Sequence, residues 1–222
     1  MTLPLMIFAA GKGTRMAPLT DVMPKPLIAV GGRSLLDRAL DLAQAAEVER
    51  IVVNIHHLGS QIRDHIGDQV QISDESDLLL ETGGGLRKAL PLLGAGPVIT
   101  MNPDVVWTGP NPVSALLEAW NDDMHALLML VPMSRTHGRQ GGGDFSLGAD
   151  NHLIRKGDLV YGGVQIIRPD RLEEIPDEVF SLNRLWDILI AEGQAYGLVH
   201  GGAWCDVGRP DCIPLAEGLL GV

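Results

Sequence analysis

The chain has 222 residues, of which 45% are hydrophobic and 20% charged, and this composition is ordinary for a globular protein with one core. Its net charge of −11 at pH 7 argues against a nucleic-acid partner, which would need a basic surface. No apolar run approaches the length of a membrane span, and the apolar first ten residues lack the basic start and cleavage site of a signal peptide. We therefore expect a cytoplasmic protein without membrane partners, folded as one domain over residues 1–222.

Short apolar runs alternate along the chain with segments of helical periodicity. The runs predict strands at 5–9, 50–55, 97–101, 126–131, 159–167 and 195–200. The periodic segments predict helices at 35–46, 58–66, 85–93, 113–120, 183–192 and 210–219, and the glycine-rich stretch 138–148 predicts a mobile loop. The alternation predicts an α/β fold: a Rossmann-like, open, mostly parallel sheet with helices on both faces.

A glycine-rich loop follows the first predicted strand and carries Gly11, Gly13 and Arg15. Glycines let backbone N–H groups approach an anion, and Lys25, the second lysine, after Lys12, stands between two prolines that restrict its backbone. The spacing is not that of a Walker loop, and Met16 replaces the third glycine of a dinucleotide fingerprint. A tight turn with solvated cations would explain Gly-x-Gly alone, but the added Arg15 and Pro-Lys-Pro favour a site for nucleotide phosphates.

Two carboxylates complete the candidate chemistry. Asp104 follows the predicted strand 97–101, and ligands of open α/β sheets bind beyond the carboxyl ends of the strands, so Asp104 and the glycine loop should share one edge. Asp206 lies between Trp204 and Gly208, and either aspartate alone could equally be a turn residue. Cys205 and Cys212 fit neither a redox pair nor a zinc motif, and we expect reduced thiols.

Residues 9–27 resemble the signature of the sugar-1-phosphate nucleotidylyltransferases, which runs Gly-x-Gly-Thr-Arg-Leu/Met, Pro-Leu-Thr and Pro-Lys-Pro-Leu. Segments 81–85, 102–105 and 202–208 match the family in the same order, so the resemblance spans nearly the whole chain. Within the family, the Leu-Glu-Thr-Gly-Gly-Gly form and the short length are most similar to the N-acetylmuramate-1-phosphate uridylyltransferases of cell-wall recycling.

The resemblance implies transfer of a nucleotidyl group from a nucleoside triphosphate to a sugar-1-phosphate, with Mg²⁺ as cofactor and pyrophosphate as the second product. UTP with N-acetylmuramate-1-phosphate is the expected pair. A guanylyltransferase for mannose- or heptose-1-phosphate is the alternative within the family, and a catalytically silent nucleotide-sugar sensor is the alternative of another class. The family also implies a monomer or homodimer.

The resemblance assigns roles residue by residue. It implies that Arg15, Lys25 and Asp104 are catalytic and that Asp104 and Asp206 hold the metal. The nucleotide-binding residues would be Ala9, Gly11, Lys12, Gly13, Thr14, Arg15, Asn54, Thr82, Gly83 and Gly84. The sugar-phosphate residues would be Lys25, Asp144, Lys156 and Gly162, where Lys156 stands in for the lysine of the family's Glu-Lys-Pro sequence. Thr82 could equally cap a helix, Asn54 could be a plain strand-end residue, and Asp144 could belong to a hairpin turn.

Overall fold

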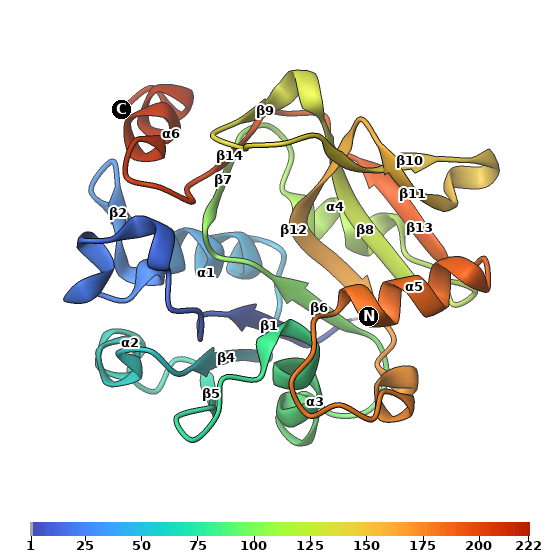
Figure 1. Cartoon of the computed structure of the whole chain (residues 1–222), viewed down its shortest axis with the longest axis horizontal. Coiled ribbons are helices and arrows are strands. Elements are labelled where there is room, and N and C mark those ends of the chain that lie inside the picture. The colour runs from blue at the N-terminus through green and yellow to red at the C-terminus, as the bar shows by residue number, and fades with distance from the viewer. Residues whose placement is uncertain (1) are drawn as a thin grey trace.

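The computed structural model describes residues 2–222 and places a nine-stranded sheet at the centre of the molecule (Figure 1). Seven strands follow one another in the order β11-β10-β12-β6-β1-β4-β5, and β8 and β13 continue the sheet from β12. The bounds of these strands are β1 Leu5–Phe8, β4 Ile51–Ile55, β5 Gln71–Asp74, β6 Val98–Met101, β8 Ala126–Pro132, β10 Gly143–Leu147, β11 Leu153–Gly157, β12 Leu159–Ile167 and β13 Ala195–Val199. A two-stranded sheet joins β2 (Ala29–Val30) to β3 (Arg33–Ser34).

The half of the sheet around β1 is parallel. β1 pairs in parallel with β4 on one side and with β6 on the other, and β5 continues beyond β4. β12 turns the pairing antiparallel where it meets β6, and β13 is again parallel to β8. The carboxyl ends of β1, β4 and β6 therefore lie at one edge, and the prediction of an open α/β sheet is confirmed.

Helices cover both faces because side chains alternate along the strands. Leu5 and Ile7 of β1 join the core that contains buried residues of α1 (Leu35–Ala45), α2 (Gly59–Ile66) and α4 (Pro112–Ala119). Met6 lies in the other core, with α3 (Glu81–Leu93) and α5 (Asn183–Ala191). α6 (Cys212–Leu220) packs beside β2 near the C-terminus, where Glu217 accepts a hydrogen bond from the N–H of Gly31 (Figure 1). None of the helices within residues 2–222 combines the length and the apolar character needed to cross a membrane.

A three-stranded sheet, which the sequence did not predict, brings Asp104 and Asp206 together. β7 (Val105–Trp107) begins directly after Asp104, and β14 (Trp204–Asp206) ends at the other aspartate. The two strands are antiparallel with Asp206 opposite Val105, and the N–H of Val207 donates to the carbonyl of Asp104 at 2.9 Å. β9 (Thr136–His137) completes this sheet in parallel with β14.

The prediction of a loop at 138–148 was wrong in its second half. β10 occupies Gly143–Leu147 and pairs with β11, because Phe145 is fully buried and anchors the hairpin. α3 begins at Glu81, four residues before the predicted start, and its first turn contains Gly83 and Gly84.

Candidate active site

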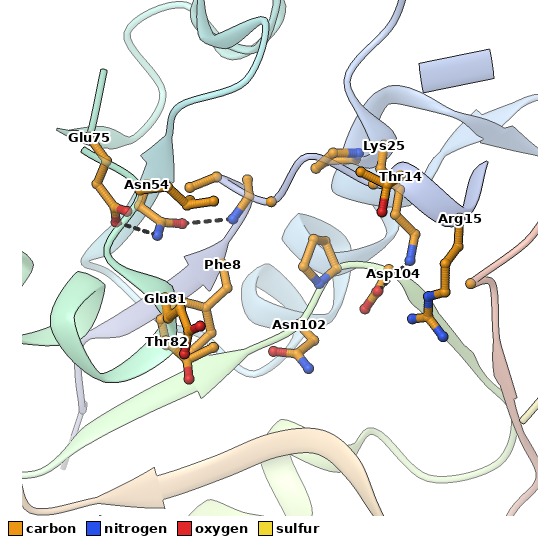
Figure 2. A pocket seen from close by; sticks show the side chains of 18 of the residues that line it. Phe8, Thr14, Arg15, Lys25, Asn54, Glu75, Glu81, Thr82, Asn102 and Asp104 are labelled. Carbon is orange, nitrogen blue, oxygen red and sulfur yellow. Dashed lines mark hydrogen bonds and ion pairs between the residues drawn. The ribbon is translucent and has the colours of Figure 1, made fainter. Parts of the chain in front are cut away.

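Two adjoining cavities lie at the carboxyl edge of the sheet. The first, of about 450 Å³, is lined by the glycine loop and by Lys25, Asn54, Glu75, Glu81 and Thr82 (Figure 2). The second, of about 330 Å³, is lined by Asp144, Arg155, Tyr161 and Asp206 among others. The linings of both cavities include Phe8, Arg15, Thr82, Asn102, Asp104 and Ser181. A reaction between occupants of the two cavities would take place at these shared residues.

The glycine loop positions Lys25. Gly13 has a φ of 61°, in the left-handed region that glycine adopts without strain. A Cβ atom at Gly13 would lie 2.9 Å from the Cβ of Lys25, so only glycine allows the two segments to approach this closely. The hydroxyl of Thr20 donates to the carbonyl of Gly13 at 3.0 Å and holds the loop in place. The prolines and this contact together fix the lysine side chain at the wall of the first cavity.

Lys25 forms an ion pair with Asp104 at the junction of the cavities. Its Nζ lies 2.5 Å from Oδ2 of Asp104, and the lysine side chain is only 11% exposed. Arg15 lies beside this pair and is exposed at the same junction (Figure 2). The ammonium group of Lys25 thus lies at the wall of the first cavity, and the guanidinium group of Arg15 lies where both cavities meet, so that two cations are available to polyanionic ligands.

Asp104 and Asp206 are close enough to influence each other. The pKa of Asp206 is raised first by burial and then by the negative charge of Asp104, while the positive charges of Lys25 and Arg15 act in the opposite direction. Within residues 2–222, no group of three or more His, Cys, Asp or Glu side chains forms a metal cage. Two carboxylates with room for phosphate oxygens and water nevertheless match the ligands that Mg²⁺ takes in nucleotide sites. The donor set therefore fits a hard divalent cation.

Asn54 is bonded to the protein at both ends of its amide. Its Oδ1 accepts from the N–H of Ala9 at 2.7 Å, and its Nδ2 donates to Oε1 of Glu75 at 2.6 Å. The side chain is 3% exposed, so Asn54 lies in the cavity wall with its hydrogen-bonding groups already used. The N–H of Ala9 is used in the same way. Glu75 was not predicted as a site residue, because a carboxylate after a strand carries no distinctive local pattern.

Gly83 and Gly84 serve helix packing. Their N–H groups both donate to the carbonyl of Phe180, at 2.8 and 3.2 Å. A Cβ at Gly83 would lie 2.3 Å from the Phe180 ring, and one at Gly84 would lie 2.4 Å from the carbonyl oxygen of Glu178. These glycines therefore let α3 pack closely against segment 178–182, and their N–H groups are not free for a base.

Thr82 is the member of the glycine segment that lines both cavities. Its hydroxyl accepts from the N–H of Leu182 at 2.9 Å, and it lies in the first turn of α3 without capping the helix.

The second cavity contains an arginine that sequence analysis missed. Asp144 accepts from Arg139 at 2.6 Å through Oδ1 and from the N–H of Tyr161 at 3.0 Å through Oδ2. Arg139 also donates to the carbonyl of Gly142, so its guanidinium is held at the cavity wall. Arg155 lies 5.0 Å from the centroid of the Phe145 ring, at another part of the wall. Asp144 thus positions an arginine in the predicted sugar site.

Besides Gly83 and Gly84, three more predicted residues lie apart from the cavity walls. In the part of the chain that the structure describes, Lys12 and Lys156 are exposed and line neither cavity. Gly162 is buried behind the second cavity, where its carbonyl accepts from Nε1 of Trp204 at 2.9 Å and a Cβ would strike the Trp107 ring. Its neighbour Gly163 lines the cavity instead.

Residues 5–159 match the family described as the MobA-like NTP transferase domain. The chain belongs to this family. It is 40% identical to the N-acetylmuramate alpha-1-phosphate uridylyltransferase of Caulobacter vibrioides, over 97% of this chain and 96% of that protein. It is 37% identical to the uridylyltransferase of the same name from Neisseria meningitidis serogroup B, over 97% of both chains. The chain is thus a sugar-1-phosphate nucleotidyltransferase, as its motifs predicted.

Solved structures share the fold of this nucleotidyltransferase. HddC from Yersinia pseudotuberculosis superimposes with a TM-score of 0.79 at 22% identity, over 99% of this chain and 100% of that chain. A putative glucose-1-phosphate thymidylyltransferase from Bacillus anthracis gives 0.82 at 15% identity, over 98% of this chain and 95% of that chain. The predicted fold class is confirmed by both.

Proposed function

We propose that the enzyme transfers a uridylyl group from UTP to N-acetylmuramate-1-phosphate, forming UDP-N-acetylmuramate and pyrophosphate. The observation that carries the reaction type is the meeting of two cavities at Arg15 and Asp104, where Asp104 is paired with Lys25 of the first cavity. The similarity of nearly the whole chain to two uridylyltransferases for this sugar phosphate supports the substrate pair. The product places the enzyme in the recycling of peptidoglycan sugars.

The nucleotide would occupy the first cavity, with its triphosphate along the glycine loop. Arg15 and the backbone of Gly11, Gly13 and Thr14 would hold the β- and γ-phosphates, and Lys25 would lie against the α-phosphate. The sugar phosphate oxygen then attacks the α-phosphorus, the bond to the β-phosphate oxygen breaks, and pyrophosphate leaves. The attacking oxygen is already ionised at neutral pH, so no general base is needed, and catalysis is positioning and charge stabilisation.

Asp104 and Asp206 would hold Mg²⁺ between the two cavities. When bound, the cation would supply positive charge that stabilises the charge developing on the phosphates. Before binding, the ion pair with Lys25 keeps Asp104 oriented toward the shared space. The protein therefore presents one carboxylate directly before β7 and another at the end of the neighbouring strand β14, at the place where the phosphates would meet.

The sugar would occupy the second cavity. Tyr161, Trp186 and Trp204 contribute aromatic surface that suits the apolar face of a sugar ring. Arg139, which Asp144 holds, and Arg155, which pairs with Asp187, bring guanidinium groups to this cavity wall that suit phosphate and carboxylate oxygens, and N-acetylmuramate carries a carboxylate in addition to its phosphate. This combination supports an acidic sugar in preference to a neutral one.

The test is pyrophosphate release by purified protein with Mg²⁺, each of five nucleoside triphosphates, and a panel of sugar-1-phosphates. The panel contains the N-acetylmuramate, N-acetylglucosamine, mannose, heptose and glucose phosphates. Turnover concentrated on UTP with the muramate substrate supports the proposal. Turnover with GTP and a manno sugar would replace the substrates and keep the mechanism. Tight UTP binding without turnover on any sugar would instead support the sensor alternative.

A further inference from the structure

Glu75 is a buried carboxylate that the proposed chemistry does not use. It follows β5 directly, its exposed fraction is 0%, and no basic side chain within residues 2–222 forms a salt bridge with it. A buried charge without hydrogen-bond partners is costly, and Glu75 meets that cost with two donors. Its Oε1 accepts from Nδ2 of Asn54 at 2.6 Å, and its Oε2 accepts from the N–H of Leu80 at 3.1 Å.

These bonds connect two walls of the first cavity (Figure 2). At one end, Oδ1 of Asn54 accepts from the N–H of Ala9, where β1 passes into the glycine loop. At the other end, Leu80 immediately precedes Glu81 and Thr82, which line the cavity at the start of α3. One continuous chain of hydrogen bonds thus runs from the phosphate loop through β4 and β5 to the start of α3.

We propose that Glu75 and Asn54 are positioning residues that fix the distance between the phosphate-binding wall and the α3 wall, and thereby set the affinity for the nucleotide. This inference rests on the proposed function only in taking the occupant of the first cavity to be a nucleoside triphosphate. Neither residue lines the second cavity, so the sugar phosphate should be unaffected by their replacement.

The donor and acceptor directions of these hydrogen bonds require one carboxylate and one amide at positions 54 and 75. Both oxygens of Glu75 accept, so glutamine at this position would turn its NH₂ group toward one of two donors. Gly85 shows how tightly the carboxylate is enclosed, since a Cβ there would lie 2.7 Å from Oε1 of Glu75 and 3.1 Å from Nδ2 of Asn54. The glycine leaves room for the chain of bonds within the packed start of α3.

An isosteric exchange of the two groups tests the proposal. In Asn54→Asp, two carboxylates meet; in Glu75→Gln, a donor meets a donor. In the double variant, the carboxylate at position 54 accepts from the N–H of Ala9 and from the amide of the side chain at position 75. The carbonyl of that amide accepts from the N–H of Leu80, so every bond is restored and the carboxylate has moved from position 75 to position 54. The charge and volume of the site are conserved.

The measurement is the Kd of UTP by titration calorimetry, together with the KM values of both substrates and the Tm of every variant. We expect each single variant to raise the Kd of UTP by about tenfold or more, because one buried hydrogen bond is lost. The double variant should return to within a few-fold of wild type, and the KM of the sugar phosphate should change by less than twofold throughout. Thr100→Val, which removes a buried hydrogen bond to Gln165 on a neighbouring strand, should leave the Kd of UTP unchanged.

The proposal is overturned if the double variant binds UTP as weakly as the single variants, if the single variants bind like wild type, or if both KM values rise together. Should Asn54→Asp fail to fold, the comparison of Glu75→Gln with the double variant decides the question. The titration needs no turnover, so a wild type that binds nucleotide without reacting would refute the proposed function and leave this test intact. The titrant is then the triphosphate that wild type binds most tightly.

Discussion

Replacing Lys25 by methionine removes the charge at the junction of the cavities and retains most of the side-chain volume. The lysine stem packs against Gly13 and its side chain is 11% exposed, so a shorter residue would add a cavity to the loss of charge. A unit charge about 4 Å from the reacting phosphate contributes about 4 kcal/mol at an effective dielectric constant of 20. At about 1.4 kcal/mol for each factor of ten, Lys25→Met should lower kcat by about 10³-fold.

The assay is the initial rate of pyrophosphate release at saturating concentrations of both substrates, with Tm measured in parallel to show that the variant is folded. Lys88→Met, on the exposed surface of α3, serves as the matched control and should retain kcat within about twofold. A folded Lys25→Met enzyme with kcat within tenfold of wild type would refute the reasoning, since the charge would then contribute equally to ground state and transition state.

Three further outcomes are expected. Without metal, Asp206→Asn should raise Tm at neutral pH, because burial and the charge of Asp104 raise the pKa of Asp206 and make its charged form costly. This gain in Tm should vanish as the pH falls through the raised pKa to the ordinary value of 3.8, where the carboxyl is protonated in both the folded and the unfolded protein. Added Mg²⁺ should raise the Tm of the wild type only. Arg139→Ala should raise the KM of the sugar phosphate about tenfold while Lys156→Ala leaves it within twofold, and the reverse order in steady-state kinetics would return the role to Lys156. Gly218→Ala, in open space on α6, should increase the free energy of unfolding by up to about 1 kcal/mol in urea titrations, because alanine favours a helix. Gly85→Ala should lower the free energy of unfolding, because its Cβ would collide with Glu75. Equal effects of the two variants would show that the site around Gly85 is not tightly packed.

The conformation of the glycine loop could be predicted from the sequence because its determinants are local. Glycine and proline restrict the backbone wherever they occur, so Gly13 and the prolines around Lys25 act within a few residues of the chain. The main strands were also predictable, since long apolar runs such as 159–167 belong to a sheet buried on both faces.

The parts that depend on distant segments were not predictable. β7 and β14 have three residues each, too few for a periodic pattern, yet their pairing brings Asp104 and Asp206 together. Arg139 was hidden in a glycine-rich stretch that gave no sign of Asp144 holding its guanidinium. The segment Gly83–Gly84 was interpreted as a nucleotide contact on family resemblance, whereas the structure uses both glycines for packing against 178–180, about 95 residues away in sequence.

The proposed reaction transfers the α-phosphorus of the nucleotide to the sugar phosphate. It is tested most directly by incubating the enzyme with Mg²⁺, N-acetylmuramate-1-phosphate and UTP labelled with ³²P at either the α- or the γ-position, followed by separation of the nucleotide sugar from pyrophosphate. We expect the α-label to appear in UDP-N-acetylmuramate and the γ-label only in pyrophosphate. Appearance of the γ-label in a sugar product, or the absence of a labelled sugar nucleotide after incubation with α-labelled UTP, would contradict this reaction.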